Sequence, residues 1–335
     1  MSKVTIGFVT WNGARYLKSN LEALLLQSNQ DFELLMMDNG STDGTIEILQ
    51  EYKQKFGERC SLTLNSENFG FAKGHNMLMR QSQSQYYMAL NQDIVLDKEY
   101  IELCAQVLDS NPLIGSVSGK ILVWDFVHSV FTSTIDSLGL EIKRWGQVIE
   151  KNVGEQDSSE VRGNIEVFGV SGTVPLYSKK ALEAVAFNSE FFDESFFSYK
   201  EDVDLAFRLR WAGYTSYVVT DARAYHDRGA KSTENMTFAE AHLYRRQKKS
   251  LINYHSYKNH LAIIAKNYSW EMLLFRFPWL FLYEVSKFVY IGLTEIQTLS
   301  SLKDFVRLWG STIQKRKFIQ KHARSSYRQM LAWMR

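Results

Sequence analysis

The regular alternation of strand-like and helix-like segments in the first 110 residues restricts the fold more than any other feature of the sequence. Short apolar runs occupy residues 4–10, 32–37, 60–64 and 86–90, and stretches with helical spacing occupy residues 16–27, 74–83 and 98–109. Strands that alternate with helices of this length form βαβ units, in which neighbouring strands are parallel. We therefore predict an α/β fold with a mostly parallel sheet flanked by helices.

The remainder of the chain divides into a mixed part and a helical part. Further strands are predicted at residues 114–123, 165–170 and 215–219, and further helices at residues 179–185 and 201–212. The polar stretch 124–164 is less regular and predicts loops or an inserted hairpin. Beyond residue 237 the spacing is almost entirely helical. We expect a unit at residues 1–236 followed by a C-terminal helical extension at residues 237–335.

The charge of the chain is divided unequally between its two parts. Residues 242–335 contain 17 Lys and Arg but only four acids, a balance of +13, whereas residues 1–241 carry −11. Within the stretch 272–294, Arg276, Glu284 and Lys287 interrupt the apolar residues, and the longest uncharged runs have seven residues. A membrane span needs about 20. The pattern predicts an amphipathic helix that packs on the rest of the protein, on an anionic membrane surface or on a second copy in a homodimer.

The cysteine content and the first residues indicate the cellular compartment in which the protein works. Cys60 and Cys104 are the only cysteines, which is too few for a disulfide framework and lacks the spacing of a zinc site. The first residues enter a strand-like run without the apolar core of a signal peptide. We expect a reducing, cytoplasmic location.

Two polar segments follow predicted strands, where ligands bind in open α/β sheets. Asp38, in MMDNGSTDGT, could accept a hydrogen bond from a nucleobase, or could form a turn in which Thr42 or Asp43 caps the next helix. In NFGFAKGHN, Lys73 could meet a phosphate. The alternative is a tight turn into a helix, because neither GxxxxGK[ST] nor GxGxxG is present.

Carboxylates in two other places could take part in metal binding and proton transfer. Asp93 follows the strand at 86–90 and could bind Mg²⁺ or Mn²⁺ together with His226, although singly each could be a turn acid or a packed histidine. Glu201 and Asp202 begin a helix, where the macrodipole favours acids. The same amides keep a carboxylate ionised, as a general base must be.

The order and spacing of these segments resemble the family 2 glycosyltransferases, which are inverting enzymes with the GT-A fold, a Rossmann-like α/β architecture. The resemblance covers about residues 3–230 and rests on the segments VTWNG, MMDNGSTDGT, NFGFAKGHN, LNQD, FGVSGT, FFDESFFSYKEDVDLAFRLRWAGY and AYH. An NxD in place of the acidic DxD, and IDSLGLEIKRWG before VFGVSGT, are similar to the bacterial rhamnosyltransferase-like branch.

The resemblance implies a role for each matching residue. It places Thr10, Trp11, Asn12, Asp38, Gly70, Lys73, Asn76 and Asn91 around the nucleotide. It makes Asp93 and His226 the metal ligands, and Ser171, Gly172, Thr173 and Glu201 the lining of the sugar and acceptor pocket. Asp202 stands at the position of the catalytic base. Asn91 departs from the acidic motif, so metal binding is expected of Asp93 rather than of the whole motif.

The implied activity is metal-dependent transfer of a sugar, rhamnose from dTDP-rhamnose, to a hydroxyl of a polyprenyl-linked glycan on the cytoplasmic face of a bacterial membrane, in the synthesis of surface polysaccharide. A UDP-hexose donor and an inactive sugar-nucleotide or glycan-binding module are the alternatives. A processive synthase is disfavoured because LYRRQKKS lacks an RW pair. A polyprenyl-phosphate sugar synthase would not need the Glu201–Asp202 pair. Nucleic acid is not an expected partner, since the C-terminal aromatics have helical spacing rather than the arrangement of a stacking platform.

Overall fold

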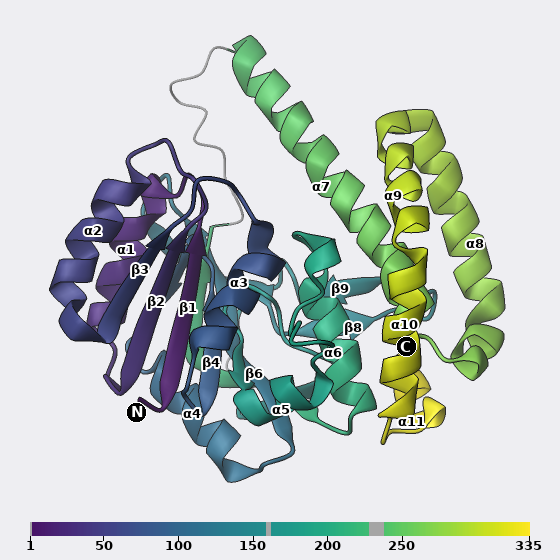
Figure 1. The fold of residues 1–335 in the computed structure, drawn as a ribbon, viewed down its shortest axis with the longest axis horizontal. Coiled ribbons are helices and arrows are strands. Elements are labelled where there is room, and N and C mark those ends of the chain that lie inside the picture. Colours follow the sequence, from purple (N-terminus) through teal and green to yellow (C-terminus); the bar gives the residue numbers. More distant parts are fainter. Residues whose placement is uncertain (1, 159–161, 228–237) are drawn as a thin grey trace.

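The first half of the chain forms a parallel sheet with alternating helices, as predicted (Figure 1). The computed structural model describes residues 2–158, 162–227 and 238–335. The strands are β1 (Val4–Thr10), β2 (Phe32–Asp38), β3 (Cys60–Leu64) and β4 (Tyr86–Leu90), and the helices are α1 (Ala14–Leu25), α2 (Thr45–Phe56), α3 (Gly70–Gln81) and α4 (Tyr100–Ser110). β1 pairs in parallel with both β2 and β4, and β2 pairs in parallel with β3.

The second half extends this sheet in a mixed manner, so the sheet is less parallel than expected. The added strands are β5 (Ile94–Leu96), β6 (Ile114–Asp125), β7 (Val130–Ser137), β10 (Asn164–Val167), β11 (Leu176–Ser178) and β12 (Thr215–His226). The strand order is β10-β12-β6-β11-β4-β1-β2-β3, with β5 on β12 and β7 on β6. β6 and β12 are parallel, but β11 joins β4 and β6 in antiparallel fashion. Only three residues long, β11 is too short to produce a recognisable pattern.

Helices cover both faces of the sheet, so its central strands are buried on both sides. On one face Leu21, Leu49 and Cys104 of α1, α2 and α4 share a core with alternate residues of β1 and β2. On the other face α3 packs with α5 (Lys179–Val185) and α6 (Glu201–Trp211). This arrangement explains why the strands appear as continuous apolar runs rather than alternating ones.

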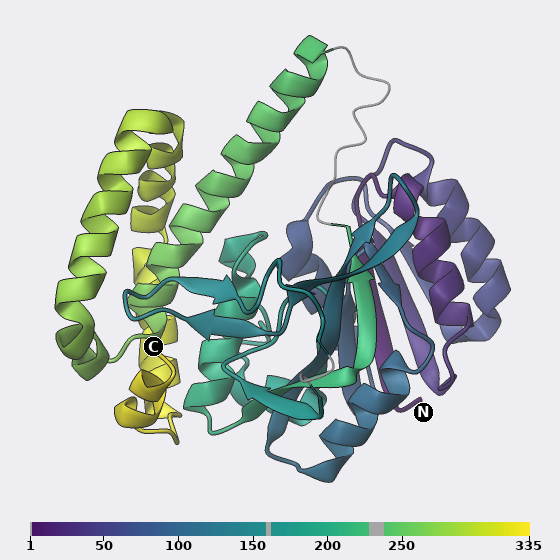
Figure 2. The same ribbon diagram turned by 180° about the vertical axis from the view of Figure 1, so that it is seen from behind.

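The irregular stretch 124–164 contains the hairpin that was one of the two alternatives predicted for it. β8 (Leu140–Ile142) pairs antiparallel with β9 (Val148–Glu150), in addition to β7 on the edge of β6. The hairpin extends from the main sheet toward the C-terminal helices (Figure 2).

The C-terminal helices pack directly on α6 and on this hairpin. They are α7 (Phe238–Asn267), α8 (Trp270–Thr294), α9 (Ser301–Arg307), α10 (Trp309–Lys321) and α11 (Tyr327–Ala332), with a short 3₁₀ turn at Ile296–Ser300 between α8 and α9. Two other 3₁₀ turns, Gly57–Arg59 and Glu194–Phe196, lie earlier in the chain. Phe207 and Trp211 of α6 share an apolar cluster with Ile263, Tyr268 and Met330. In both views α8 lies at the outer edge of the molecule (Figures 1 and 2). In the ranges that the structure describes, none of the helices combines the length and apolar character that crossing a membrane would require.

Candidate active site

The carboxyl ends of three parallel strands bring Thr10, Asp38 and Asn91 to one edge of the sheet. Thr10 and Asp38 are paired in register at the ends of β1 and β2, and Asn91 directly follows β4 on the other side of β1. Parallel strands end on the same side, so these residues necessarily gather there. The structure therefore places at one edge the two segments around Asp38 and Asp93 that the sequence put after strands, together with Thr10 at the end of β1.

The loop after β1 leaves an aromatic ring at this edge. Trp11 is 52% exposed, while Thr10 is buried, and Gln92 binds both of them through its Oε1. Asn12 adopts a left-handed backbone conformation with φ 49° and accepts a hydrogen bond from the Thr42 amide at 2.9 Å. Gln92 was not among the predicted residues, although it lies between Asn91 and Asp93.

Asp38 organises the turn that follows β2. Its Oδ2 accepts hydrogen bonds from the amides of Gly40 at 3.0 Å and Ser41 at 2.9 Å, and its Oδ1 accepts one from the Ser41 hydroxyl. Asp38 is fully buried. The N-cap of α2 is Gly44 and it makes no side-chain cap hydrogen bond, so neither Thr42 nor Asp43 caps this helix as predicted. Asp43 instead accepts a hydrogen bond from the Thr45 amide at 3.2 Å. A nucleobase contact by Asp38 stays a prediction.

Two residues expected near the nucleotide instead face a neighbouring loop. Asn76 is fully buried, and it exchanges hydrogen bonds of 2.8 Å with both the carbonyl and the amide of Phe192. Gly70 has φ 76°, and a Cβ there would lie 2.6 Å from the ring and carbonyl of Phe197. Their side-chain positions therefore offer no surface to a ligand in this structure, because the loop 192–197 packs over them.

Lys73 lies near the start of α3, which begins at Gly70, four residues earlier than predicted. Its ammonium nitrogen is 4.2 Å from the centre of the Phe69 ring, and the side chain is partly exposed. A partly exposed ammonium can approach a phosphate as a point charge.

Asp93 and His226 lie next to each other because β5 and β12 are antiparallel neighbours. His226 pairs in register with Ile94, and its Nε2 is 3.5 Å from Oδ2 of Asp93. On the other side of the ring, Nδ1 is 2.9 Å from Oδ2 of the buried Asp136, a residue that the sequence did not point to. Burial opposes the charged imidazole, but the two carboxylates outweigh it and raise the pKa of His226 to about 9.

This pair has the chemistry of a site for a hard divalent cation. Mg²⁺ and Mn²⁺ accept carboxylate oxygen and imidazole nitrogen, and such ions often take only one or two protein ligands beside substrate phosphates. Asp136 orients the ring through Nδ1, as carboxylates commonly do behind metal-binding histidines. Within the described parts of the chain, there is no group of three or more His, Cys, Asp or Glu side chains arranged to hold a metal without a substrate.

Residues 171–173 connect the Asp93 side of the site to Asp202. The Gly172 amide donates a hydrogen bond of 2.8 Å to Oδ2 of Asp202, and the carbonyl of Thr173 accepts one of 3.0 Å from the Asn91 amide. The hydroxyl of Ser171 donates to Glu150 of β9 at 2.8 Å. One short segment thus holds the candidate base beside the segment that contains Asp93.

Glu201 and Asp202 begin α6 in a buried, acidic environment. Burial raises the pKa of both carboxyls; at Asp202 the amides of Gly172 and Val203 oppose that rise, and at Glu201 the charge of Asp202 adds to it. Oε2 of Glu201 is buried and has no hydrogen-bond partner among the described residues. The negative charge of the pair therefore resides preferentially on Asp202.

Tyr199 is a further residue of the site that the sequence analysis missed. Burial raises the pKa of its hydroxyl, and so do the negative charges of Glu201 and Asp93, which places the ring within the field of both acids. The side chain is 39% exposed. The aromatic stretch that ends at Tyr199, two positions before Glu201, was the available signal.

Asn259 of α7 supports the loop that leads into Asp202. Phe197, Tyr199 and Lys200 all have left-handed backbone conformations, with φ of 64°, 71° and 67°. Nδ2 of Asn259 lies within hydrogen-bond distance of the carbonyls of Phe196 (3.1 Å), Ser198 (3.0 Å) and Tyr199 (2.7 Å). Such conformations persist where their surroundings stabilise them. A C-terminal helix therefore shapes the site from outside the α/β unit.

Replacing Gly172 by alanine is expected to disturb Asp202 directly. The added Cβ would lie 3.0–3.2 Å from the Cβ, Cγ and Oδ2 atoms of Asp202, so the carboxylate must shift by a few tenths of an ångström. A shift of about 1 Å can cost about 10²-fold in rate. We expect turnover to fall about tenfold with unchanged nucleotide binding. Steady-state kinetics would test this, with Gly310→Ala as the control because nothing lies within 4 Å of its Cβ. Equal rates for the two variants would contradict the expectation.

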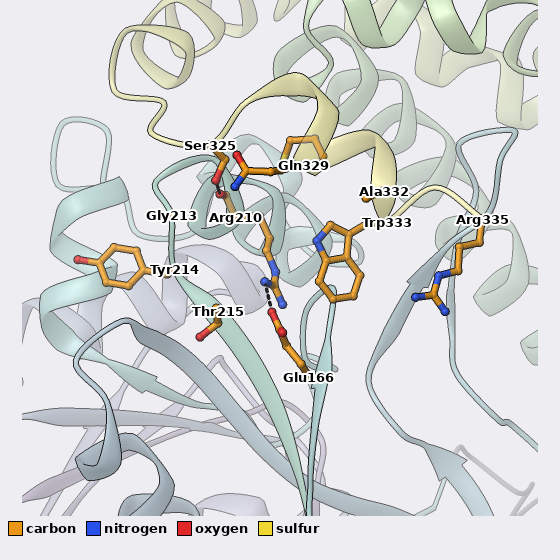
Figure 3. A pocket seen from close by; sticks show the side chains of 11 residues that line it. Glu166, Arg210, Gly213, Tyr214, Thr215, Ser325, Gln329, Ala332, Trp333 and Arg335 are labelled. Atoms are coloured by element: carbon orange, nitrogen blue, oxygen red, sulfur yellow. Dashed lines mark hydrogen bonds and ion pairs between the residues drawn. The ribbon is translucent and has the colours of Figure 1, made fainter.

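A cavity of about 390 Å³ lies at the other end of α6, about two helical turns from Asp202 (Figure 3). Arg210, whose guanidinium is 2.7 Å from Glu166 and 4.3 Å from the centre of the Trp333 ring, forms part of its wall. It is separate from the candidate active site.

The fold and the site place the chain among proteins of the GT-A fold. A fragment of Staphylococcus aureus TarS (1–349), solved with UDP, superposes with a TM-score of 0.56 at 18% identity, covering 98% of this chain and 92% of that one. The mannosyltransferase PcManGT of Pyrobaculum calidifontis, solved with GDP-Man and Mn²⁺, gives a TM-score of 0.55 at 15% identity, covering 96% and 86%. At these identities the likeness concerns the fold.

Residues 5–185, more than half of the 335 in the chain, match the model of glycosyl transferase family 2. The chain belongs to this family, as the motifs indicated. TuaG of Bacillus subtilis, named for teichuronic acid biosynthesis, is 32% identical over 134 residues, which is 38% of this chain and 53% of TuaG. TarS of S. aureus (strain Mu50), named a poly(ribitol-phosphate) beta-N-acetylglucosaminyltransferase, is 26% identical over 113 residues, 33% of this chain and 20% of TarS. The match spans about half or less of the length of these relatives.

Proposed function

We propose that this chain is an inverting glycosyltransferase that moves a sugar from a nucleoside diphosphate to a glycan hydroxyl in bacterial cell-wall polysaccharide synthesis. The observation that carries the proposal is the segment 171–173, whose backbone binds Asp202 on one side and Asn91 on the other. A proton acceptor and a metal-binding pair are thereby held at one end of the sheet.

Asp202 is the base in this proposal. The acceptor oxygen forms a bond to C1 of the sugar while the bond from C1 to the diphosphate oxygen breaks, and the acceptor proton passes to the Asp202 carboxylate. Attack from the face opposite the leaving group inverts C1. The amides of Gly172 and Val203 orient the carboxylate, and burial raises its proton affinity. A base of this kind contributes about 10²–10⁴-fold to the rate.

Asp93 and His226 would hold Mg²⁺ or Mn²⁺. Such an ion, when bound, neutralises charge that develops on the leaving diphosphate. Lys73 supplies a second cation from α3, and Asp136 keeps Nε2 of His226 directed at Asp93. Metal dependence is supported by the donor chemistry of this pair and by the Mn²⁺ in the PcManGT structure.

We further propose a pyrimidine nucleotide as the donor, with dTDP-rhamnose the first candidate and a UDP-hexose the second. The similarity to the rhamnosyltransferase-like branch supports the former, and the UDP in the TarS structure supports the latter. A polyprenyl-linked glycan on the cytoplasmic face of the membrane is the proposed acceptor, which fits the cell-wall polymers in the names of TuaG and TarS.

Calorimetric binding of dTDP, UDP and GDP, with and without Mn²⁺, tests the donor site without knowledge of the acceptor. We expect one pyrimidine diphosphate to bind in the presence of Mn²⁺ and Asp93→Ala to weaken this binding by at least about 10–100-fold, since loss of even a partner behind a metal ligand has an effect of this size. Asp97→Ala is the matched control, since Asp97 is exposed four residues further on. Absence of metal-dependent binding of all three nucleotides would favour an inactive binding module instead.

A further inference from the structure

The outer face of α8 has a continuous apolar stripe. Trp270, Leu274, Phe277, Phe281, Val285 and Phe288 follow one another at intervals of three or four residues and are between 44% and 77% exposed. The rings of Phe277 and Phe281 stack with centroids 5.5 Å apart. Residues at this spacing lie on one side of a helix. We call these six residues the α8 stripe.

Beyond the first turn of α8, where Glu271 is exposed, the charged residues of the helix face the protein rather than the solvent. Arg276 donates to the carbonyls of Leu331 at 3.2 Å and Met334 at 2.8 Å, and Glu284 is 2.6 Å from Nε2 of His260. Lys287 lies 5.1 Å from the centre of the Tyr257 ring. An ordinary surface helix buries its apolar side and exposes its charges. The buried side of α8 also includes Met272, Leu280 and Ile291, so the helix has apolar residues on both sides. The stripe is therefore an apolar surface that is not used in packing the described part of the chain.

The composition and charge of this region match a lipid surface. The stripe consists of Trp, Phe, Leu and Val without a charge, the composition of helices that lie in the interface of a bilayer. Among the basic residues of this region, Lys266 and Lys315 pair with buried acids. Lys317, Lys321 and Arg324 are exposed and are attracted to anionic headgroups. Lys303 and Arg307 of the adjoining α9 are exposed.

We propose that the α8 stripe lies in the headgroup region of an anionic bilayer and holds the protein on its surface. The helix lies parallel to the membrane and does not cross it. This docking would bring the active site close to a lipid-linked acceptor, a benefit that rests on the proposed function. The docking itself follows from the surface of α8.

Co-sedimentation of the full chain with vesicles tests this inference. We expect binding to vesicles of phosphatidylcholine with phosphatidylglycerol, weaker binding to phosphatidylcholine alone, and loss of binding at high salt. Phe277→Gln with Phe281→Gln should lower the bound fraction at least tenfold, because two large apolar side chains leave the interface. Leu64→Gln with Leu113→Gln is the matched control, since these leucines are 46% and 53% exposed on the α/β unit.

Absence of wild-type binding to both vesicles would overturn the inference, and so would equal binding of the stripe variant and the control. It would also be overturned if the wild type bound no vesicles but formed a dimer, and the stripe variant were a monomer. Light scattering measures the last of these. Circular dichroism and a cooperative unfolding transition show that each variant is folded, and nucleotide binding is measured on the same preparations. Vesicle binding without nucleotide binding would contradict the proposed function and leave the docking inference in place.

Discussion

Asp202→Asn is expected to lower kcat by about 10²–10⁴-fold and to leave the affinity for the nucleoside diphosphate unchanged. The amide cannot accept the acceptor proton, whereas the donor site at the ends of β1, β2 and β4 does not use this side chain. Both carboxylate oxygens accept backbone hydrogen bonds, from Gly172 and Val203. An asparagine can satisfy only one of these donors, so a stability loss of about 1–3 kcal/mol is also expected. Product release measures turnover, and calorimetry measures binding.

The neighbouring acid provides the control for this variant. Glu201→Gln changes a carboxyl whose Oε2 has no partner among the described residues and whose pKa is raised by burial and by Asp202. A group that is mostly protonated loses little when it becomes an amide, so we expect less than a tenfold change in kcat. Near wild-type turnover for Asp202→Asn would contradict the assignment of the base. A larger loss in Glu201→Gln than in Asp202→Asn would move that assignment to Glu201.

Lys266→Met is expected to lower the free energy of unfolding by about 3–5 kcal/mol. Lys266 lies on α7, is 1% exposed, and its ammonium is 2.5 Å from Asp193 and 2.8 Å from Asp204. Its loss leaves an excess of buried negative charge between α6 and the C-terminal helices, although Lys315 and Arg208 still contact the two acids. Denaturant unfolding measures the change. Lys3→Met, which removes an exposed pair with Asp109, is the control, with an expected cost of about 0–1 kcal/mol.

The same cluster has a consequence at low pH. Burial would raise the pKa of Asp193, but the ammonium groups of Lys266 and Lys315 outweigh burial and hold that pKa well below its usual range. A carboxyl with a lowered folded-state pKa stabilises the protein above about pH 4, and this contribution is lost as the pH falls further. The unfolding free energy of the wild type should therefore fall more steeply below pH 4 than that of Lys266→Met. Parallel curves would show that the pair does not contribute.

The sequence analysis predicted the parts of the site that depend on local pattern. Asp38 and Asp93 follow strands because apolar runs of strand length precede them, and parallel pairing puts both at the same edge of the sheet. The closeness of Asp93 and His226 came from the family motifs and is seen in the structure. The family resemblance placed Asn76 near the nucleotide, whereas in the structure its side chain is buried against Phe192. A motif indicates residue type and spacing but does not show what covers a side chain.

Residues that act from a distance could not be found in the same way. Asp136 reaches His226 across 90 residues of sequence, and Asn259 reaches the loop before Asp202 from about 60 residues away. Each is an ordinary polar residue in its own surroundings. No periodicity or spacing relates it to the site, because the contact exists only after separate elements have packed together.

The sequence alone determined the α/β class, the family and the two faces of α8. The periodicity of the sequence gives the relative positions of side chains around the helix axis, so it shows that α8 has one charged and one apolar side. It does not show which side faces the protein. Which side faces inward depends on the surfaces that other segments present. His260 and the carbonyls of Leu331 and Met334 draw Glu284 and Arg276 inward and leave the apolar side outside. Only the tertiary structure decided that orientation, because its partners lie outside α8, on α7 and near the C-terminus, and reach it only after these segments have packed together.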